Sequence, residues 1–129
     1  MIYDFERDVD SRVIYVTLEL ENKYALKMVL DTAASCTTID VNALYMAGYS
    51  IDNKPETCTV ETANGMMNVY LFEVKSLTAL GRTINNMPVH VYDFLAHGIV
   101  SDYDGLLGLD FFENTVLSID MKNNTIEVS

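Results

Sequence analysis

Two adjacent segments with a two-residue hydrophobic alternation most constrain how this chain folds. Between Val13 and Leu20 every second side chain is aliphatic, and the alternation returns between Leu26 and Leu30. A polar stretch, 21–23, separates the two segments. Alternation with a period of two is typical of a strand with one buried face. Two such strands joined by a short polar interruption predict a β-hairpin.

Further strand signals follow along the chain. The turn sequences Asn64-Gly65 and Gly81-Arg82 are typical of tight turns between paired strands, and 122–124 is a third polar turn. The pattern therefore predicts a mostly β chain, with strands at 58–62, 68–74, 77–80, 87–92, 116–119 and 125–128.

Two short helices are expected between the strands. Asp40 precedes an apolar stretch over 41–47 that ends at Gly48, which is the usual arrangement of a helix with an aspartate cap and a glycine stop. Asp110 is predicted to cap a helical turn over 111–113. The acidic stretch 96–104 is expected to be a loop.

Length and charge narrow the classes of function. We expect residues 1–129 to form a single domain, because no linker or low-complexity tract divides them. The formal net charge is −11, which argues against binding nucleic acid or an anionic membrane surface. No apolar run is long enough to span a bilayer, and the N-terminus lacks an apolar signal core.

The cysteines and histidines are few. Without a secretion signal, Cys36 and Cys58 are expected to be reduced thiols in a cytoplasmic protein, although pairing between them stays open. His90 and His97 form no metal-ligand spacing with them, so no metal is expected.

One stretch combines a carboxylate with a turn. Asp31-Thr32 follows directly after the apolar residues 28–30 and leads into small residues. A strand that ends there would present the Asp31 carboxylate on a loop that a substrate can approach. A second loop, 104–108, is rich in glycine and leucine, and the Asn64-Gly65 turn lies midway between the two.

These pieces resemble, in order, the motifs of retropepsin-like aspartic proteases. Asp31-Thr32-Ala33-Ala34-Ser35 is similar to the family's Asp-Thr/Ser-Gly motif, and Leu106-Leu107-Gly108 to its hydrophobic-hydrophobic-Gly motif. The stretch 62–65 is similar to the start of the flap hairpin, and 110–112 to the short helix that follows the glycine. The resemblance spans roughly 13–128 and implies a closed, β-barrel-like retropepsin (acid protease) domain with two short helices.

The resemblance also implies a function. Aspartic proteolysis needs two carboxylates that share one proton and activate a water molecule. Because the chain has one Asp-Thr motif, the second carboxylate must come from a second subunit, so the expected enzyme is a homodimer of Asp31-bearing subunits. Thr32 would form a hydrogen-bond grip across the dimer below the two carboxylates. No metal or organic cofactor is implied.

The resemblance assigns further residues to substrate binding. The substrate would be a peptide or protein segment bound as an extended strand. Ala33 is expected at the catalytic turn with Asp31 and Thr32. The residues expected to contact or support the substrate are Ala34, Ser35, Asn64, Gly65, Met66, Met67, Leu106, Leu107 and Gly108.

Two positions depart from the family pattern or vary within it. Ala33 replaces the motif glycine and adds a methyl group at the expected dimer axis. Ala34 has no hydroxyl to stabilise the carboxylate pair, so we expect activity at weakly acid rather than strongly acid pH.

Other functions stay open. Because of Ala33, the same fold could be a non-catalytic peptide-binding or dimerisation module, or a monomer with a purely structural cleft. Asp104 is a rival to Asp31, since it adjoins the second loop, and catalysis by Cys36 with a histidine is another alternative. The substrate and the biological process do not follow from the sequence.

Overall fold

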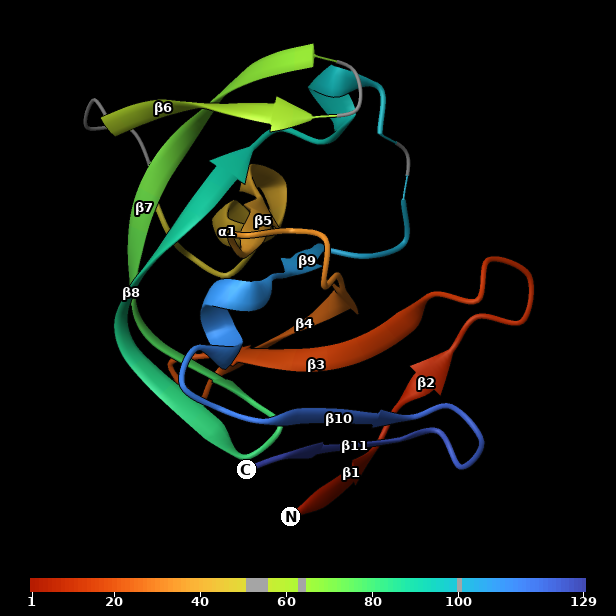
Figure 1. Cartoon of the computed structure of the whole chain (residues 1–129). Helices are drawn as coiled ribbons and strands as arrows, with labels where there is room; N and C mark the ends of the chain where they lie inside the picture. The colour runs from red at the N-terminus through yellow and green to blue at the C-terminus, as the bar shows by residue number, and fades with distance from the viewer. Residues whose placement is uncertain (51–55, 63–64, 100) are drawn as a thin grey trace.

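A computed structural model describes residues 1–50, 56–62, 65–99 and 101–129, and most of them lie in strands (Figure 1). The elements in chain order are β1 (Ile2–Asp4), β2 (Glu6–Arg7), β3 (Ile14–Leu20), β4 (Tyr24–Leu30), β5 (Thr38–Asp40), α1 (Val41–Met46), β6 (Glu56–Thr62), β7 (Gly65–Ala79), β8 (Arg82–Tyr92), the 3-10 helix η1 (Leu95–His97), β9 (Gly105–Leu107), the 3-10 helix η2 (Leu109–Phe112), β10 (Leu117–Asp120) and β11 (Thr125–Val128).

The larger sheet closes on itself. Its strand order is β2-β3-β4-β9-β5-β8-β7-β6. An additional pairing of β3 with β7 closes the run of strands from β3 to β7 into a ring. Strands β3, β4, β9, β5, β8 and β7 therefore form a closed barrel, which confirms the predicted fold class. Beyond the barrel, β6 and the first half of β7 continue as a hairpin at the top of Figure 1.

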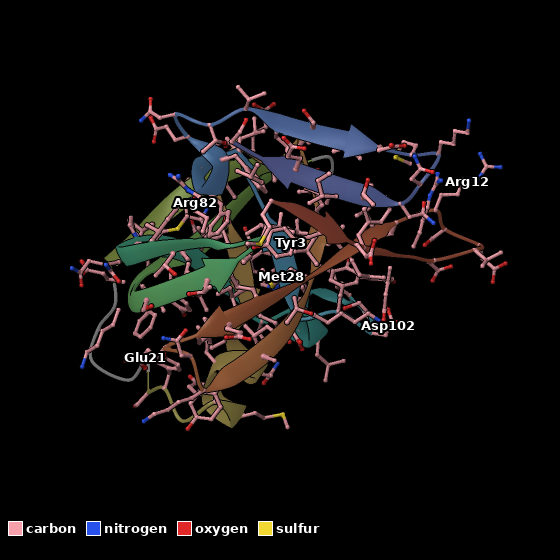
Figure 2. All side chains as sticks on the ribbon, turned by 90° about the horizontal axis from the view of Figure 1, so that it is seen from below. Tyr3, Arg12, Glu21, Met28, Arg82 and Asp102 are labelled. Atoms are coloured by element: carbon pink, nitrogen blue, oxygen red, sulfur yellow. The ribbon has the colours of Figure 1, made fainter. Side chains whose placement is uncertain are left out.

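The predicted first hairpin is confirmed as β3 and β4. They pair antiparallel, with Val16 opposite Met28 and Leu18 opposite Leu26. Alternate side chains of β3 are buried, as the two-residue period requires, while Thr17 between them is exposed. Met28 lies near the centre of the molecule in the view of Figure 2 and is fully buried.

A second, smaller sheet packs at one end of the barrel. Its strand order is β1-β11-β10, and β10 with β11 forms the predicted last hairpin. Tyr3 of β1 lies beside the β7–β8 turn, where a side chain on Gly81 would clash with its hydroxyl group. Arg82, at the start of β8, donates hydrogen bonds from its guanidinium to the carbonyls of Phe111 and Glu113 at 3.0 and 3.1 Å.

The observed helices agree only partly with those predicted from the sequence. Asp40 caps α1, because its side chain accepts a hydrogen bond from Asn42 N, and Gly48 follows in a left-handed conformation, as predicted. The predicted cap role of Asp110 is wrong: η2 already begins at Leu109, and its N-cap position is Gly108. In the described part of the chain, no helix has the length and hydropathy needed to cross a membrane.

Several short elements were not predicted. β1, β2, β5 and η1 span two or three residues each, too few to show a periodic pattern. β7 is one continuous strand of 15 residues, where the sequence predicts two strands, because it runs from the hairpin with β6 into the barrel wall.

Candidate active site

Strand β4 places Asp31 at the point where it leaves the barrel wall. The neighbouring strand β9 runs parallel to β4, with Leu30 opposite Leu107. Asp31 N donates to the Leu107 carbonyl at 3.1 Å, so the ladder extends one residue past the strand. The carboxylate is therefore carried by the end of a rigid sheet, as the sequence predicted for the Asp-Thr motif.

The residues after Asp31 form a tight turn around its carboxylate. Asp31 Oδ1 accepts a hydrogen bond from Ala33 N at 3.0 Å, and the Asp31 carbonyl accepts one from Ala34 N at 3.1 Å. Asp31 is half-buried, whereas Thr32 and Ala33 are exposed. We call residues 31–37 the Asp31 loop; Thr32 and Ala33 lie on its exposed face.

Ala33 fits the backbone of this turn. Among the described residues, seven that are not glycine have a positive φ, and Ala33 is not one of them. The alanine therefore adds its methyl group without backbone strain in the turn. Any cost of replacing the motif glycine must arise where another molecule contacts the exposed methyl group.

A second segment lies directly against the Asp31 loop. Residues 108–110, the Gly108 turn, follow β9, which is inserted between β4 and β5 in the sheet. Leu109 N donates to the Ala34 carbonyl at 2.8 Å, and Asp110 N donates to the Ser35 carbonyl at 3.2 Å. The structure thus brings together the two sequence motifs that lie about 75 residues apart in the chain.

The predicted residues of the second motif lie behind the loop. Leu107 is fully buried, Gly108 is buried, and Leu106 is half-buried. A Cβ atom at Gly105 would come within 2.1 Å of the Thr38 carbonyl oxygen, so this glycine is required where β9 passes β5. Leu107 and Gly108 contact the Asp31 loop directly, through the bond from Asp31 N to the Leu107 carbonyl and the close approach of Gly108 to the backbone of Cys36.

The flap-like hairpin is formed by β6 and β7. Thr62 pairs with Gly65, and Glu61 pairs with Met66, so the hairpin ends where the sequence predicted its turn. Met66 is 70% exposed and Gly65 has φ +108°, a value that favours glycine. Asn64 lies outside the described residues, and the side chain of Met67 is not described either.

An aromatic cluster surrounds η1. The rings of Tyr92 and Phe94 are 4.8 Å apart, and His97 packs edge-on against Tyr92 at 5.5 Å. Burial raises the pKa of Tyr92. Hydrogen bonds from Ala96 N and the Asn42 side chain lower the pKa of Asp93, which anchors the start of η1.

The rival residues have other surroundings. Asp104 Oδ2 accepts a hydrogen bond from Lys27 N at 2.8 Å, and Asp104 N donates to the Lys27 carbonyl, so this aspartate bridges to β4 through its side chain and backbone. Cys36 is a free, half-buried thiol whose sulfur lies 3.9 Å from Ser35 Oγ. His97 Nδ1 lies 2.8 Å from the Asp93 carbonyl oxygen.

Metal ligands do not gather in the described residues. Within 1–50, 56–62, 65–99 and 101–129, no group of three or more His, Cys, Asp or Glu side chains is arranged to bind a metal ion.

Comparison with known proteins places this geometry in a family. The sequence model of a family described as aspartyl protease matches residues 16–111, a segment that includes both the Asp31 loop and the Gly108 turn. The chain belongs to the aspartyl protease family. Among curated proteins, none matches the chain by sequence.

A solved structure supports the same fold for this aspartyl protease family member. The crystal structure of a retropepsin-like aspartic protease from Rickettsia conorii superposes with a TM-score of 0.71 at 22% sequence identity. The match covers 98% of this chain and 88% of that chain. At this level of identity the similarity shows the retropepsin-like fold.

Sequence reasoning missed two residues beside the site of this family member. The sequence pattern indicates a helix cap at Asp110 and assigns no role to Thr37. Their side chains bond to each other across 73 positions of the chain. No local pattern could have indicated this, because the contact depends on how β9 is inserted between β4 and β5.

Proposed function

We propose that this chain is an aspartic endopeptidase that hydrolyses peptide bonds as a homodimer. One Asp31 carboxylate from each subunit would activate a water molecule between them, with a single proton shared by the pair. The observation that carries this proposal is the position of Asp31 in a member of the aspartyl protease family: the carboxylate lies at the end of β4 in a loop whose next two residues, Thr32 and Ala33, are exposed.

The exposed face of the Asp31 loop suits a two-fold contact. In a C2 dimer the same patch faces itself, so each Asp31 would meet its own copy across the axis. Thr32 follows Asp31 directly and is exposed, so its hydroxyl group could bond to the partner loop. The carboxylate pair and the Thr32 bond both require a second subunit, because the chain contains one Asp-Thr motif.

The substrate would lie between the Asp31 loop and the β6–β7 hairpin. An extended peptide can bond to backbone groups of such a hairpin, while side chains contribute selectivity. Met66 is largely exposed and is flexible enough to contact side chains of different shapes. Closure of the hairpin would exclude water from the carboxylate pair.

One observation favours a second function. The exposed Ala33 methyl group stands where the family motif has glycine, and it would lie close to the two-fold axis. If that contact separates the carboxylates, the chain would be a non-catalytic peptide-binding or dimerisation module, since a shift of about 1 Å can lower a rate by about 100-fold.

Oligomeric state and cleavage decide between the two functions. Sedimentation at micromolar concentration should show a dimer, and a mixed peptide library should be cut by the wild type but not by Asp31→Asn. A dimer that binds peptides and cuts none would favour the module. A chain that stays monomeric with peptide present would contradict both the protease and the dimerisation module.

A further inference from the structure

A carboxylate and a buried hydroxyl connect the two segments that form the site. Asp110 Oδ1 accepts a hydrogen bond from Thr37 Oγ1 at 2.7 Å, and both carboxylate oxygens lie 2.9 Å from Thr37 N, which donates to them. Thr37 is fully buried. Its hydroxyl oxygen also accepts a hydrogen bond from Gly108 N at 3.1 Å. The Thr37 hydroxyl group therefore donates to Asp110 and accepts from Gly108, and in this way it links the Asp31 loop to the Gly108 turn.

This contact fixes the far end of the Asp31 loop. The near end is fixed by the bond from Asp31 N to the Leu107 carbonyl. The middle is bonded through the carbonyls of Ala34 and Ser35 to the backbone of 109–110. At the far end, Thr37 is the residue where the loop enters β5, and there the partner is a side-chain carboxyl group that accepts hydrogen bonds from both the backbone N and the hydroxyl group of Thr37.

Asp110 differs in this respect from the aspartates that stabilise turns. Asp120 Oδ1 accepts hydrogen bonds from Lys122 N and Asn123 N, both at 3.0 Å and both within its own turn. Asp110 lies inside η2 but forms no cap bond there. Its carboxylate bonds instead to the end of the loop that carries Asp31. Its effect is therefore directed at the position of that loop.

We propose that Asp110 is a positioning residue that acts through Thr37 to fix the Asp31 loop where the carboxylate pair can form. The proposal rests on the proposed function. The Asp31 loop has an exposed outer face and contacts 107–110 on its inner side. These inner contacts therefore set how far the loop projects toward a partner subunit. Loss of the contact between Asp110 and Thr37 would let the loop shift at its far end while β4 and β9 stay paired.

Four single variants and one double variant test this role. Asp110→Ala removes every hydrogen bond between this carboxylate and Thr37, whereas Thr37→Val removes the hydroxyl bonds to Asp110 and Gly108 and keeps those from Thr37 N. Asp110→Ala should lower kcat by about 100-fold, the cost of a displacement of about 1 Å, and Thr37→Val should lower it in the same direction. KM should change little, because the β6–β7 hairpin is untouched. Thr37→Ser keeps the hydroxyl group and should retain most of the activity, and Asp110→Asn, which keeps one acceptor oxygen, should be intermediate. The double variant Asp110→Ala/Thr37→Val should lose less than the product of the two single losses, because both substitutions remove the bond between the Thr37 hydroxyl group and Asp110.

A matched control separates positioning from stability. Asp120→Ala also removes a carboxylate that accepts backbone hydrogen bonds, but in the β10–β11 turn. It should lower the melting temperature and leave kcat unchanged. All assays are run well below the lowest melting temperature, with circular dichroism to confirm folding and sedimentation to confirm the dimer. Amide hydrogen exchange at 32–37 should be faster in Asp110→Ala than in the wild type and unchanged in Asp120→Ala.

The outcomes of this experiment are distinguishable. A wild type that cleaves, with kcat lost in Asp110→Ala and Thr37→Val and retained in Thr37→Ser, supports the inference. A wild type that cleaves while Asp110→Ala keeps its kcat overturns the inference and leaves the proposed function intact. An equal loss of kcat in Asp120→Ala also overturns it, because the effect would then be general. A wild type that cleaves nothing overturns the proposed function, and this inference with it.

Discussion

Gly108 lies so close to Cys36 that a Cβ atom added to it would be 2.6 Å from the Cys36 carbonyl carbon. The same atom would be 2.8 Å from the carbonyl oxygens of Ala34 and Cys36. All three neighbours are backbone atoms of the Asp31 loop. Since φ at Gly108 is −94°, glycine is needed here for space and not for its backbone angle.

Replacing this glycine should therefore destabilise the protein and displace the loop. We expect Gly108→Ala to lower the free energy of unfolding by about 1–3 kcal/mol, the usual cost of overpacking. Urea denaturation followed by circular dichroism measures this. Ser35→Ala, in the exposed part of the same loop, is the control and should have little effect. Wild-type stability in Gly108→Ala would show that the loop moves away at no cost.

The sequence was sufficient for the parts of the fold that depend on local pattern. The period-two alternation in 13–30 predicted β3 and β4, and Asp40 with Gly48 marked the ends of α1. Tight-turn residues located the β7–β8 hairpin, where Leu80 and Gly81 both have positive φ. These features arise within a few residues, so they can be read before the chain is folded.

The other parts of the fold and of the site depend on contacts between residues that lie far apart in the sequence. β5 has three residues and is defined by its neighbours β8 and β9, not by its own pattern. The bond between Thr37 and Asp110 exists because β9 is inserted between β4 and β5. The resemblance to retropepsin-like proteases supplied the order of the motifs, while the structure supplied the contacts between them.

Substitution of the proposed catalytic residue gives the most direct test of chemistry. Asp31→Asn should lower kcat by at least about 100-fold, because an amide cannot accept the proton of the attacking water. Its Oδ1 atom can still accept the hydrogen bond from Ala33 N, so folding and dimerisation should be preserved. Initial rates on a fluorogenic peptide measure the loss. Asp102→Asn, in the exposed loop before β9, is the control and should cleave at close to the wild-type rate.

Replacing Ala33 by the glycine of the family motif should separate the effect of this residue on the dimer contact from its effect on monomer stability. Ala33→Gly relieves any crowding at the dimer axis, so we expect kcat/KM to rise and the dimer to dissociate less readily. Because φ at Ala33 is not positive, the change should also lower monomer stability by about 0.4–1 kcal/mol through the entropy of the unfolded chain. Steady-state kinetics, sedimentation and denaturation are measured together. A variant with unchanged kcat/KM would show that the methyl group is not an obstacle.

The pH dependence of cleavage tests the role of Ala34. Without a hydroxyl group at this position, the carboxylate pair lacks one donor that would stabilise its ionised form. We therefore expect a bell-shaped profile with its maximum at weakly acid pH. Ala34→Ser should move the acid limb of kcat to lower pH, because the new hydroxyl group can donate to the pair. A wild-type maximum well below about pH 4 would contradict this assignment.

The stability of the fold in acid should follow from aspartates that bond to backbone amides. Hydrogen bonds from Ala96 N and the Asn42 side chain lower the pKa of Asp93 below 3.8, and bonds from Ser11 N and Asp10 N do the same for Asp8. A carboxyl group whose pKa is lower in the folded state adds stability above its unfolded pKa, and this is lost as the pH falls through the folded value.

The melting temperature should therefore respond little to these groups at weakly acid pH, where cleavage is expected, and should fall below about pH 4. Asp93→Asn keeps one acceptor oxygen but cannot be protonated, so its melting temperature should fall less steeply over the same range. Thermal denaturation from neutral to strongly acid pH measures the slope of melting temperature against pH for the variant and for the wild type. Ser118→Ala, on the exposed side of β10, serves as a control without a titrating group and should reproduce the wild-type slope. Equal slopes in Asp93→Asn and the wild type would show that the start of η1 does not contribute to acid stability.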